Sequence, residues 1–354
     1  MAFESYAGDA MPVRGFCIGA PRPAEVDRFI TFIDKELAPR DVNTLILRVE
    51  YGYQFTSRPE MADKHGLSHD DVKKLVAACK KDNIQLIPEI DCLGHQSFGS
   101  HLDALLRVHP EFDETPQVAI PEHYKWPNAD KLYCKSYCPL HPQVHEVVFA
   151  LMDELCDAFE SDTFHAGMDE VFYIGETNCP RCAGKDRSQL FAGEVTALDD
   201  HLREKSRHLW IWGDRLLDGK TTGLGEWEAS ENDTFRAVDL IPKDVTICDW
   251  HYDHPDPTPV YFAAKGFKVM ICPWKLSSPA VQEVDEMYQW RNTSSDKMKA
   301  RFLGVMQTSW NGVGGFLDKE YQSDPETVNS WNCLKAVFDE VAKLQGPDPA
   351  LKNK

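Results

Sequence analysis

The sequence lacks several features that would have set its class at once. No stretch approaches 18 consecutive apolar residues, which excludes a transmembrane helix. The first residues carry no basic segment followed by an apolar one, so we expect no export signal and a cytoplasmic location; a cleaved signal would make the location periplasmic or secreted. Basic residues are few: 38 Lys and Arg against 57 Asp and Glu give a net charge of −19. This balance argues against nucleic-acid and membrane partners.

Phosphate-binding and repeat signatures are also missing. We find no glycine-rich phosphate turn, no Walker motif and no internal repeat, which removes the common nucleotide-binding folds and the solenoids. Hydrophobic residues make up 42% of the chain, as in ordinary globular proteins, so wholesale disorder is excluded. The length of 354 residues permits one large domain or two ordinary ones.

Cysteine is present in an odd number, eleven, in a chain too long to need disulfide staples. Most of these residues lie in apolar patterns, so we expect reduced, buried thiols. Two interpretations stay open for Cys179 and Cys182, which with Cys134 and Cys138 could form a four-thiolate zinc site or could be metal-free loop thiols or a local disulfide. One Cys-x-x-Cys pair is weak evidence for zinc, and we therefore predict no metal and no cofactor.

Short apolar runs alternate with amphipathic stretches along the whole chain. The apolar runs are nearly continuous, as strands buried on both faces should be, and the amphipathic stretches repeat at helical spacing. We predict eight strands, at 13–18, 42–49, 84–90, 163–168, 208–212, 245–249, 268–271 and 304–307, and helices at 24–37, 68–79, 144–159, 188–205 and 324–344. This pattern favours an α/β protein with a single (β/α)8 TIM barrel over an open sheet.

The predicted boundaries leave little outside that barrel. Residues 1–12 are expected to be a short disordered lead, 13–345 the barrel and 346–354 a tail. In such barrels the chemistry belongs to the carboxyl ends of the strands. The side chains there are carboxylates and one histidine in the first half of the chain and aromatic residues in the second: Glu50, Glu89, Asp91, His95, Asp169, Glu170, Trp212, Trp250, Tyr252, Trp274 and Trp310.

Carboxylates beside an aromatic wall are what a glycosidase needs. Sugar rings stack their C–H faces on indole, while their hydroxyl groups need fixed polar partners. One Trp at a strand end is usually a packing residue, but a Trp at each of the last four predicted strand ends is harder to explain by packing alone. The sequence therefore predicts a carbohydrate-active site at this end of the barrel.

Two motifs at predicted strand ends resemble those of a known family. The segment from His165 through Gly167 to Asp169-Glu170 is similar to the His-x-Gly-x-Asp-Glu signature of glycoside hydrolase family 20, the β-N-acetylhexosaminidases. The segment from Pro88 to His95 resembles the family's Pro-Glu-Ile-Asp-x-x-Gly-His motif. The resemblance covers the chain from residue 13 onward. Because so few residues precede the first strand, the small α+β domain of many members is expected to be absent, as in the barrel-only group of hexosaminidase D.

The resemblance implies a substrate-assisted mechanism, in which the 2-acetamido oxygen of the sugar acts as nucleophile. Glu170 would be the general acid and then the base, and Asp169 would orient the acetamido group and stabilise the oxazolinium intermediate. Like-charge repulsion between the two carboxylates should raise one pKa. His95 would lie behind Glu170 with Glu50 as its partner, although the family commonly has Asp at that position.

The same resemblance assigns the substrate-binding residues. Arg14 would bind the 3- and 4-hydroxyl groups, because a guanidinium fork suits that bidentate task; the alternative is a surface ion pair. The motifs add Asp91 and His165. The acetamido pocket and the sugar face would be lined by the indoles of Trp212, Trp250 and Trp310. Tyr252 would replace a family Tyr that is missing here, and Trp274 is a further candidate. Gly312 stands where the family often has Glu, which leaves the choice of sugar open.

The sequence thus predicts an exo-acting, retaining β-N-acetylhexosaminidase. Its substrate would be a glycan or glycoconjugate ending in β-linked GlcNAc or GalNAc, and its oligomeric state is left open. Two alternatives remain: a sugar-binding barrel without turnover, and a retaining glycosidase with two catalytic carboxylates, in which Glu89 or Glu50 pairs with Glu170.

Overall fold

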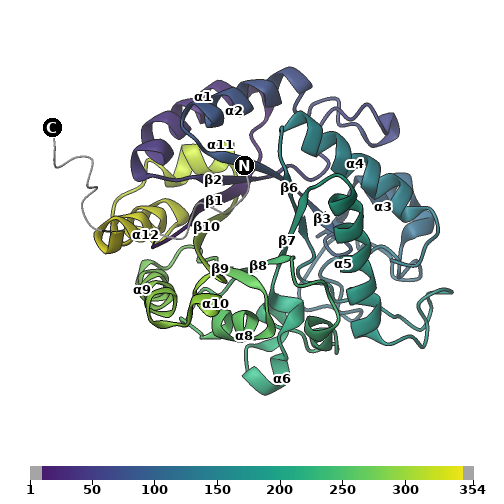
Figure 1. Cartoon of the computed structure of the whole chain (residues 1–354). Helices are drawn as coiled ribbons and strands as arrows, with labels where there is room; N and C mark the ends of the chain where they lie inside the picture. Colours follow the sequence, from purple (N-terminus) through teal and green to yellow (C-terminus); the bar gives the residue numbers. More distant parts are fainter. Residues whose placement is uncertain (1–9, 346–354) are drawn as a thin grey trace. The chain divides into compact units, whose positions relative to one another are not determined.

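The structure, a computed structural model, describes residues 10–345. Eight strands form a closed parallel barrel in the order β1-β10-β9-β8-β7-β6-β3-β2, which confirms the predicted (β/α)8 class (Figure 1). The strands are β1 (Val13–Gly19), β2 (Thr44–Arg48), β3 (Gln85–Cys92), β6 (Thr163–Gly167), β7 (His208–Trp212), β8 (Thr246–Asp249), β9 (Lys268–Ile271) and β10 (Phe302–Gly312). A two-stranded hairpin, β4 (Ser97–Phe98) and β5 (His101–Leu102), lies outside the barrel.

Twelve α-helices accompany the strands in the described residues. They are α1 (Val26–Phe32), α2 (His69–Lys81), α3 (Ala104–Val108), α4 (Val144–Ala158), α5 (Arg187–Glu204), α6 (Gly219–Thr222), α7 (Gly225–Glu228), α8 (Thr258–Lys265), α9 (Ser277–Thr293), α10 (Asp296–Lys299), α11 (Val313–Gly315) and α12 (Ser330–Gln345). Within residues 10–345, none of them is both long enough and apolar enough to cross a membrane.

Some helices differ from the prediction for local reasons. The predicted helix 24–37 is divided into a 3-10 turn, α1 and a π-helical turn, η3 (Ile33–Leu37). The last helix begins at Ser330 rather than 324, because the side chain of Asn332 donates to the carbonyls of Asp324 and Thr327 and closes a turn there. Helices α8 and α9 were not predicted; α9 buries Glu283 and Arg291, so its sequence lacks a clean apolar stripe.

The predicted chain ends lie mostly outside the described residues. Residues 1–9 of the expected lead and the whole expected tail, 346–354, are not described. Met11, also assigned to the lead, is buried, and its carbonyl accepts a hydrogen bond from the guanidinium of Arg14 at 2.7 Å.

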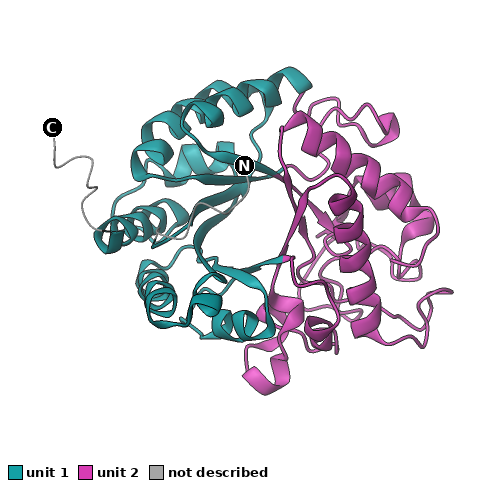
Figure 2. Cartoon of the chain, in the orientation of Figure 1, with its two compact units in different colours: residues 1–48, 69–87, 246–354 teal, residues 49–68, 88–245 magenta. Residues whose placement is uncertain are grey.

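The chain divides into two compact units, coloured separately in Figure 2. Unit 1 comprises residues 1–48, 69–87 and 246–354, and unit 2 comprises residues 49–68 and 88–245. In unit 1 the pairing of β2 with β1, β1 with β10, β10 with β9 and β9 with β8 is parallel throughout. An aromatic cluster fills its core, where Phe32 has its ring within 6.3 Å of those of Phe16, Phe316 and Trp331.

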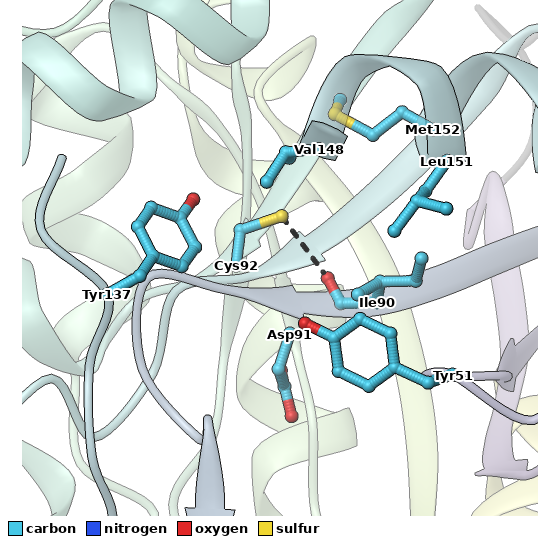
Figure 3. A pocket seen from close by; sticks show the side chains of 8 residues that line it. All are labelled: Tyr51, Ile90, Asp91, Cys92, Tyr137, Val148, Leu151 and Met152. Atoms are coloured by element: carbon cyan, nitrogen blue, oxygen red, sulfur yellow. Dashed lines mark hydrogen bonds between the residues drawn. The ribbon is translucent and has the colours of Figure 1, made fainter. Parts of the chain in front are cut away.

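In unit 2, β6 pairs in parallel with both β3 and β7. Helix α4 buries its apolar face at helical spacing, as predicted. Figure 3 shows a small cavity lined by side chains of β3 and α4, with Cys92 on the side of Val148 and Met152. Asp91 points the other way, because neighbouring side chains of a strand alternate between its faces. Asp91 and Glu89 therefore share the face of β3 opposite to that of Cys92.

Gly304 on β10 provides a test of the strand packing. It pairs with Val13 on β1, its φ is +135°, and an added Cβ would lie 2.1 Å from the carbonyl oxygen of Val13. We expect Gly304→Ala to lower the free energy of unfolding by about 3 kcal/mol or more, because backbone strain and steric overlap add.

The matched control is Gly193→Ala in α5, where an added Cβ meets nothing within 4 Å. That change should leave stability unchanged or raise it by up to about 1 kcal/mol, because Ala favours helix. Denaturant unfolding of both variants measures the difference. Equal stability of the two variants would contradict the described packing of β1 on β10.

Candidate active site

The two motifs place residues on facing positions of β3 and β6. Glu89 is opposite His165, and Cys92 is opposite Gly167. Because side chains alternate along a strand, Glu89 and Asp91 share one face of β3. Gly167 makes room for Asp91: its φ is +62°, and a Cβ there would lie 1.8 Å from Asp91 Oδ1. The glycine of the motif is thus required by the carboxylate beside it.

His95 joins the two acids of the His-x-Gly-x-Asp-Glu motif. Its Nε2 lies 3.3 Å from Asp169 Oδ2 and 3.1 Å from Glu170 Oε2. Asp169 is buried, whereas His95 and Glu170 are partly exposed. The structure therefore brings together the three residues that the motifs predicted to act as a group.

The backbone at these residues is unusual. Five non-glycine residues here have positive φ: Glu50, Leu93, His95, Met168 and Glu170, at +50°, +65°, +50°, +71° and +47°. Each of these conformations is unfavourable for a residue with a Cβ, and such strain concentrates at functional sites. The surrounding chain must hold these conformations in place.

Fixed hydrogen bonds provide that support. The side-chain amide of Gln96 donates to the carbonyls of Asp91 and Gly94 at 2.8 and 2.7 Å, which fixes the turn that carries His95. Tyr51 in turn donates its O–H to Gln96 Oε1 at 2.7 Å. Cys134 donates its S–H to the carbonyl of Glu170 at 3.5 Å. Side-chain hydrogen bonds therefore fix both the turn that carries His95 and the backbone of Glu170.

The charges of the site are strongly coupled. Burial lowers the pKa of His95, but Asp169 and Glu170 outweigh burial and hold that pKa well above its usual value. Burial raises the pKa of Asp169, but His95 outweighs it, so the pKa of Asp169 is lowered. Burial, Glu50 and Asp169 together raise the pKa of Asp91 well above its usual value. At neutral pH this favours an imidazolium beside an ionised Asp169, with the proton kept on Asp91.

Like-charge repulsion was expected to raise one pKa within the adjacent pair. Within that pair, the pKa of Asp169 is lowered because His95 lies against it. The pKa of Asp91 on β3 is raised by burial and by the carboxylates next to it.

Asp214 is a site residue to which the sequence analysis gave no role. It follows β7 directly, and its Oδ2 accepts the backbone N–H of Glu170 at 2.9 Å and the guanidinium of Arg215 at 2.6 Å. Burial raises the pKa of Asp214 to about 6 although Arg215 opposes it. Its position at a strand end was visible in the sequence, but its bond to the backbone of Glu170 was not.

Glu50 has a different partner from the one expected. Its Oε2 accepts the backbone N–H of Asp91 at 2.9 Å, and it groups with Glu89 and Asp91. The carboxylates placed on Nε2 of His95 are those of Asp169 and Glu170. The expectation that Glu50 pairs with His95 is corrected accordingly: Glu50 fixes the backbone of β3 at Asp91.

Trp212 and His165 also differ from the prediction. Trp212 is 0% exposed, and its indole N–H donates to Glu89 Oε1 at 3.1 Å. His165 is 0% exposed as well, with Nδ1 3.3 Å from the same carboxylate oxygen and its ring 4.5 Å from the indole. Both were expected to bind substrate, but they form a sealed layer beneath the acids. They support β3 and β6 rather than present a surface to a sugar.

Arg14 is a further correction. It is the second residue of β1, at the end opposite the carboxyl end of the strand. Its guanidinium is held by the carbonyls of Met11 and Asp41 and by the carboxylate of Asp41 at 3.0 Å. The prediction did not take account of the direction of the strand. Arg22, three residues beyond β1, is exposed and lies past the carboxyl end.

The predicted aromatic residues of unit 1 do gather. Tyr252 stacks on Trp250 with ring centres 5.0 Å apart and meets Trp274 edge-on at 5.4 Å. The indole N–H of Trp310 donates to the Tyr252 hydroxyl at 2.8 Å, and the guanidinium of Arg48 lies 4.9 Å from the Trp310 ring. Four of the predicted substrate-binding residues thus form one group, as a sugar platform requires.

Unit 2 contains an aromatic group that the sequence analysis did not assign. Tyr133 lies edge-on to His95 at 6.2 Å and to Trp227 at 4.7 Å. Its further ring neighbours are Phe98, Trp126 and Phe172, of which Phe98 is 63% exposed. These residues come from loops and short elements with no regular spacing, so no pattern in the sequence could identify them.

Three groups of side chains in the described part of the chain have the composition of a metal site. Two belong to the carboxylate cluster: Asp91 with His95 and Asp169, and Glu50 with Glu89 and Asp91. In these two groups, Asp169 is already paired with His95, Glu50 with the Asp91 N–H, and Glu89 with Trp212 and His165. The third group, Glu114 with Cys138, Cys179 and Cys182, lies apart from the acids.

Comparison with known proteins agrees with the motifs. Residues 49–329 match the family model described as "Glycosyl hydrolase family 20, catalytic domain". A lacto-N-biosidase of Bifidobacterium bifidum is 26% identical over 212 residues, 57% of this chain and 17% of the relative. A beta-hexosaminidase of Akkermansia muciniphila is 32% identical over 132 residues, 36% of this chain and 25% of the relative. A hexosaminidase D of Bos taurus is 24% identical over 165 residues, 44% of this chain and 41% of the relative.

The chain therefore spans less than half the length of each of these relatives. Among solved structures, a crystal structure of a beta-N-acetylhexosaminidase superposes with a TM-score of 0.64 at 17% identity, over 93% of this chain and 71% of the other. That likeness concerns the fold alone. The family match covers well over half of the chain and includes both acid-bearing motifs, so the chain belongs to glycoside hydrolase family 20.

Proposed function

We propose that the chain is an exo-acting β-N-acetylhexosaminidase that retains the anomeric configuration and uses the acetamido group of its substrate as nucleophile. The observation that carries the proposal is the contact of one imidazole nitrogen, His95 Nε2, with both Asp169 and Glu170. The proposed substrate is a glycan or glycoconjugate with terminal β-linked GlcNAc or GalNAc. Curated relatives named as beta-hexosaminidases support this substrate class.

The proposed first step breaks the glycosidic bond. Glu170, which is partly exposed, gives its proton to the leaving glycosidic oxygen, while the acetamido oxygen attacks the anomeric carbon. The product is an oxazolinium, whose positive charge forms next to Asp169. Because the pKa of Asp169 is lowered, this residue is ionised at neutral pH and can accept the acetamido N–H and stabilise that charge.

The proposed second step opens the oxazolinium. Water attacks the anomeric carbon from the face that the leaving group left, its proton passes to Glu170, and the acetamido group is restored. Two displacements at the same carbon give net retention. The bond from Asp214 to the Glu170 N–H and that from Cys134 to its carbonyl hold the acid in one place for both steps.

Sugar recognition is proposed for the residues outside the acid cluster. The aromatic group of Trp250, Tyr252, Trp274 and Trp310 would contact the sugar ring. Arg22 replaces Arg14 as the candidate for the sugar hydroxyl groups, since a guanidinium suits bidentate contacts. Tyr133 and its ring neighbours, next to His95, would contact the leaving group.

The two-carboxylate alternative has less support. Glu89 is 0% exposed and bound by Trp212, so it cannot reach an anomeric carbon as nucleophile without breaking the buried layer. Glu50 is held on the backbone N–H of Asp91. A binding barrel without turnover would have no need for a partly exposed acid positioned by Asp214, Cys134 and His95.

The acid role is tested with Glu170→Gln. We expect kcat for an alkyl N-acetyl-β-glucosaminide to fall by about 10²–10⁴-fold, because the leaving alkoxide loses its proton donor. An aryl substrate with an acidic phenol should lose much less in the bond-breaking step, since that group leaves without a proton. Single-turnover and steady-state kinetics on both substrates measure the difference.

The control for that test is Glu122→Gln, an exposed carboxylate of the 115–142 segment, which should behave like the unmodified protein. Loss of activity by the same factor on both substrates would argue against general-acid catalysis. Activity confined to sugars without a 2-acetamido group would refute the proposed function itself.

The coupling of His95 with Asp169 predicts a shift in the pH profile. Among the groups that lower the pKa of Asp169, His95 is the largest, so His95→Gln should raise that pKa. Asp169 acts in its ionised form, and the acid limb of kcat/KM should therefore move to higher pH, along with a lower maximal rate. His123→Gln, at an exposed histidine, is the control. An unchanged acid limb in His95→Gln would contradict the coupling.

A further inference from the structure

Three buried cysteines and one buried glutamate converge in unit 2. Cys138 Sγ lies 3.3 Å from Cys182 Sγ and 3.5 Å from Cys179 Sγ, and all three thiols are free. One ligand atom of each cysteine and one oxygen of Glu114 lie within 4.8 Å of one another. The motifs and the proposed hydrolysis assign no role to these four residues.

Their backbone is organised to bring them together. Glu114 and Cys138 lie on neighbouring extended segments: the N–H of Glu114 donates to the Ser136 carbonyl at 3.0 Å and that of Cys138 to the Phe112 carbonyl at 2.6 Å. Cys179 and Cys182 belong to one tight turn, in which the N–H of Ala183 donates to the Cys179 carbonyl at 3.1 Å.

Glu114 supplies the second, independent observation. It is 0% exposed, and its Oε1 accepts the N–H of Glu176 at 3.0 Å. Its Oε2 is buried and, within residues 10–345, has no hydrogen-bond partner. An ionised carboxylate oxygen that is buried without a partner is strongly unfavourable, and a bound cation would compensate its charge.

We propose that Glu114, Cys138, Cys179 and Cys182 bind one zinc ion. Three sulfurs and one oxygen within reach of a single centre match the tetrahedral coordination of Zn²⁺, and soft thiolates select it over magnesium or calcium. Four protein ligands leave no open position, which is the arrangement of a structural site and not of a catalytic one. Binding releases the protons of the three thiols to solvent, and the thiolates and the buried carboxylate become metal ligands.

The proposed site differs from the sequence analysis in two ways. The sequence predicts no metal, and the alternative with zinc uses four cysteines including Cys134. Cys134 instead donates to the Glu170 carbonyl, and Glu114 takes the fourth position. Glu114 lies about 20 residues from the nearest of these cysteines in the sequence, so no metal-binding spacing could indicate it.

The ion would join three segments of unit 2. Glu114 follows the 3-10 turn η6 (Pro110–Phe112), Cys138 ends the segment that carries Cys134 and Tyr133, and the pair Cys179 and Cys182 belongs to the loop after Glu170. Its expected role is to stabilise these loops, which have little regular secondary structure of their own.

The test uses the full chain, purified without a tag or chelator after expression in zinc-supplemented medium. Inductively coupled plasma mass spectrometry should find one zinc per chain. Cys182→Ala should reduce the metal content to background, whereas Cys156→Ala, a buried cysteine of α4, should retain it. Glu114→Gln should keep the fold and lose zinc to a chromogenic chelator at least tenfold faster than the unmodified chain.

Cobalt provides a readout that does not depend on any variant. Exchange of the unmodified chain with Co²⁺ should give intense thiolate-to-cobalt charge transfer in the near ultraviolet and visible bands of a tetrahedral ion. The proposal is overturned if the chain holds no stoichiometric zinc after refolding with Zn²⁺, or if mass spectrometry finds a disulfide between Cys138 and either Cys179 or Cys182. An unchanged chelator rate in Glu114→Gln would exclude Glu114 as a ligand.

Discussion

The contact of His95 with two carboxylates is the interaction on which the site depends. Unit 2 gathers an exceptional number of acids at the ends of β3, β6 and β7 and in the turn after β2, and without compensation they would repel one another. Five of them have a defined partner: His95 for Asp169 and Glu170, the Asp91 N–H for Glu50, Trp212 for Glu89, and Arg215 for Asp214. The imidazolium permits Asp169 to stay ionised. The remaining acids are held by hydrogen bonds or, where the pKa is raised, favoured in the protonated form.

Backbone strain is the second constraint, and it also arises from the contact of Asp169 and Glu170 with His95. Met168 and Glu170 both have positive φ, and the intervening Asp169 is buried. The positive φ values on either side of Asp169 allow Asp169 and Glu170 to point toward the same imidazole. A regular strand could not do this, because neighbouring side chains point to opposite faces. Gly167 precedes them because only glycine leaves space for Asp91. Steric and backbone requirements thus explain the spacing of the His-x-Gly-x-Asp-Glu motif.

Much of this architecture is predictable from sequence, for a physical reason. Buried parallel strands are continuous apolar runs, so β7 and β9 coincide with their predicted bounds. The two motifs located the acids and His95. Prediction failed where position along a strand or side-chain direction decides the role. Arg14 lies at the wrong end of β1, and Trp212 and His165 point into a sealed layer.

Other features depend on contacts that no local pattern encodes. Asp214 acts on the backbone of Glu170 from a different strand end, and Tyr133 meets His95 from an irregular loop. Glu114 completes the cysteine cluster from a distant segment. Helix α9 escaped prediction because it buries charged side chains, so its apolar periodicity is weak. These are tertiary effects, and only the folded chain reveals them.

The central claim is that the substrate's own acetamido oxygen is the nucleophile. The most direct test compares kcat/KM for aryl N-acyl-β-glucosaminides in which the acyl group is acetyl, fluoroacetyl, difluoroacetyl or trifluoroacetyl. Fluorine withdraws electrons from the carbonyl oxygen, so the account predicts a steep, progressive fall across the series, by orders of magnitude for trifluoroacetyl. A kcat/KM that stays constant across the series would contradict it.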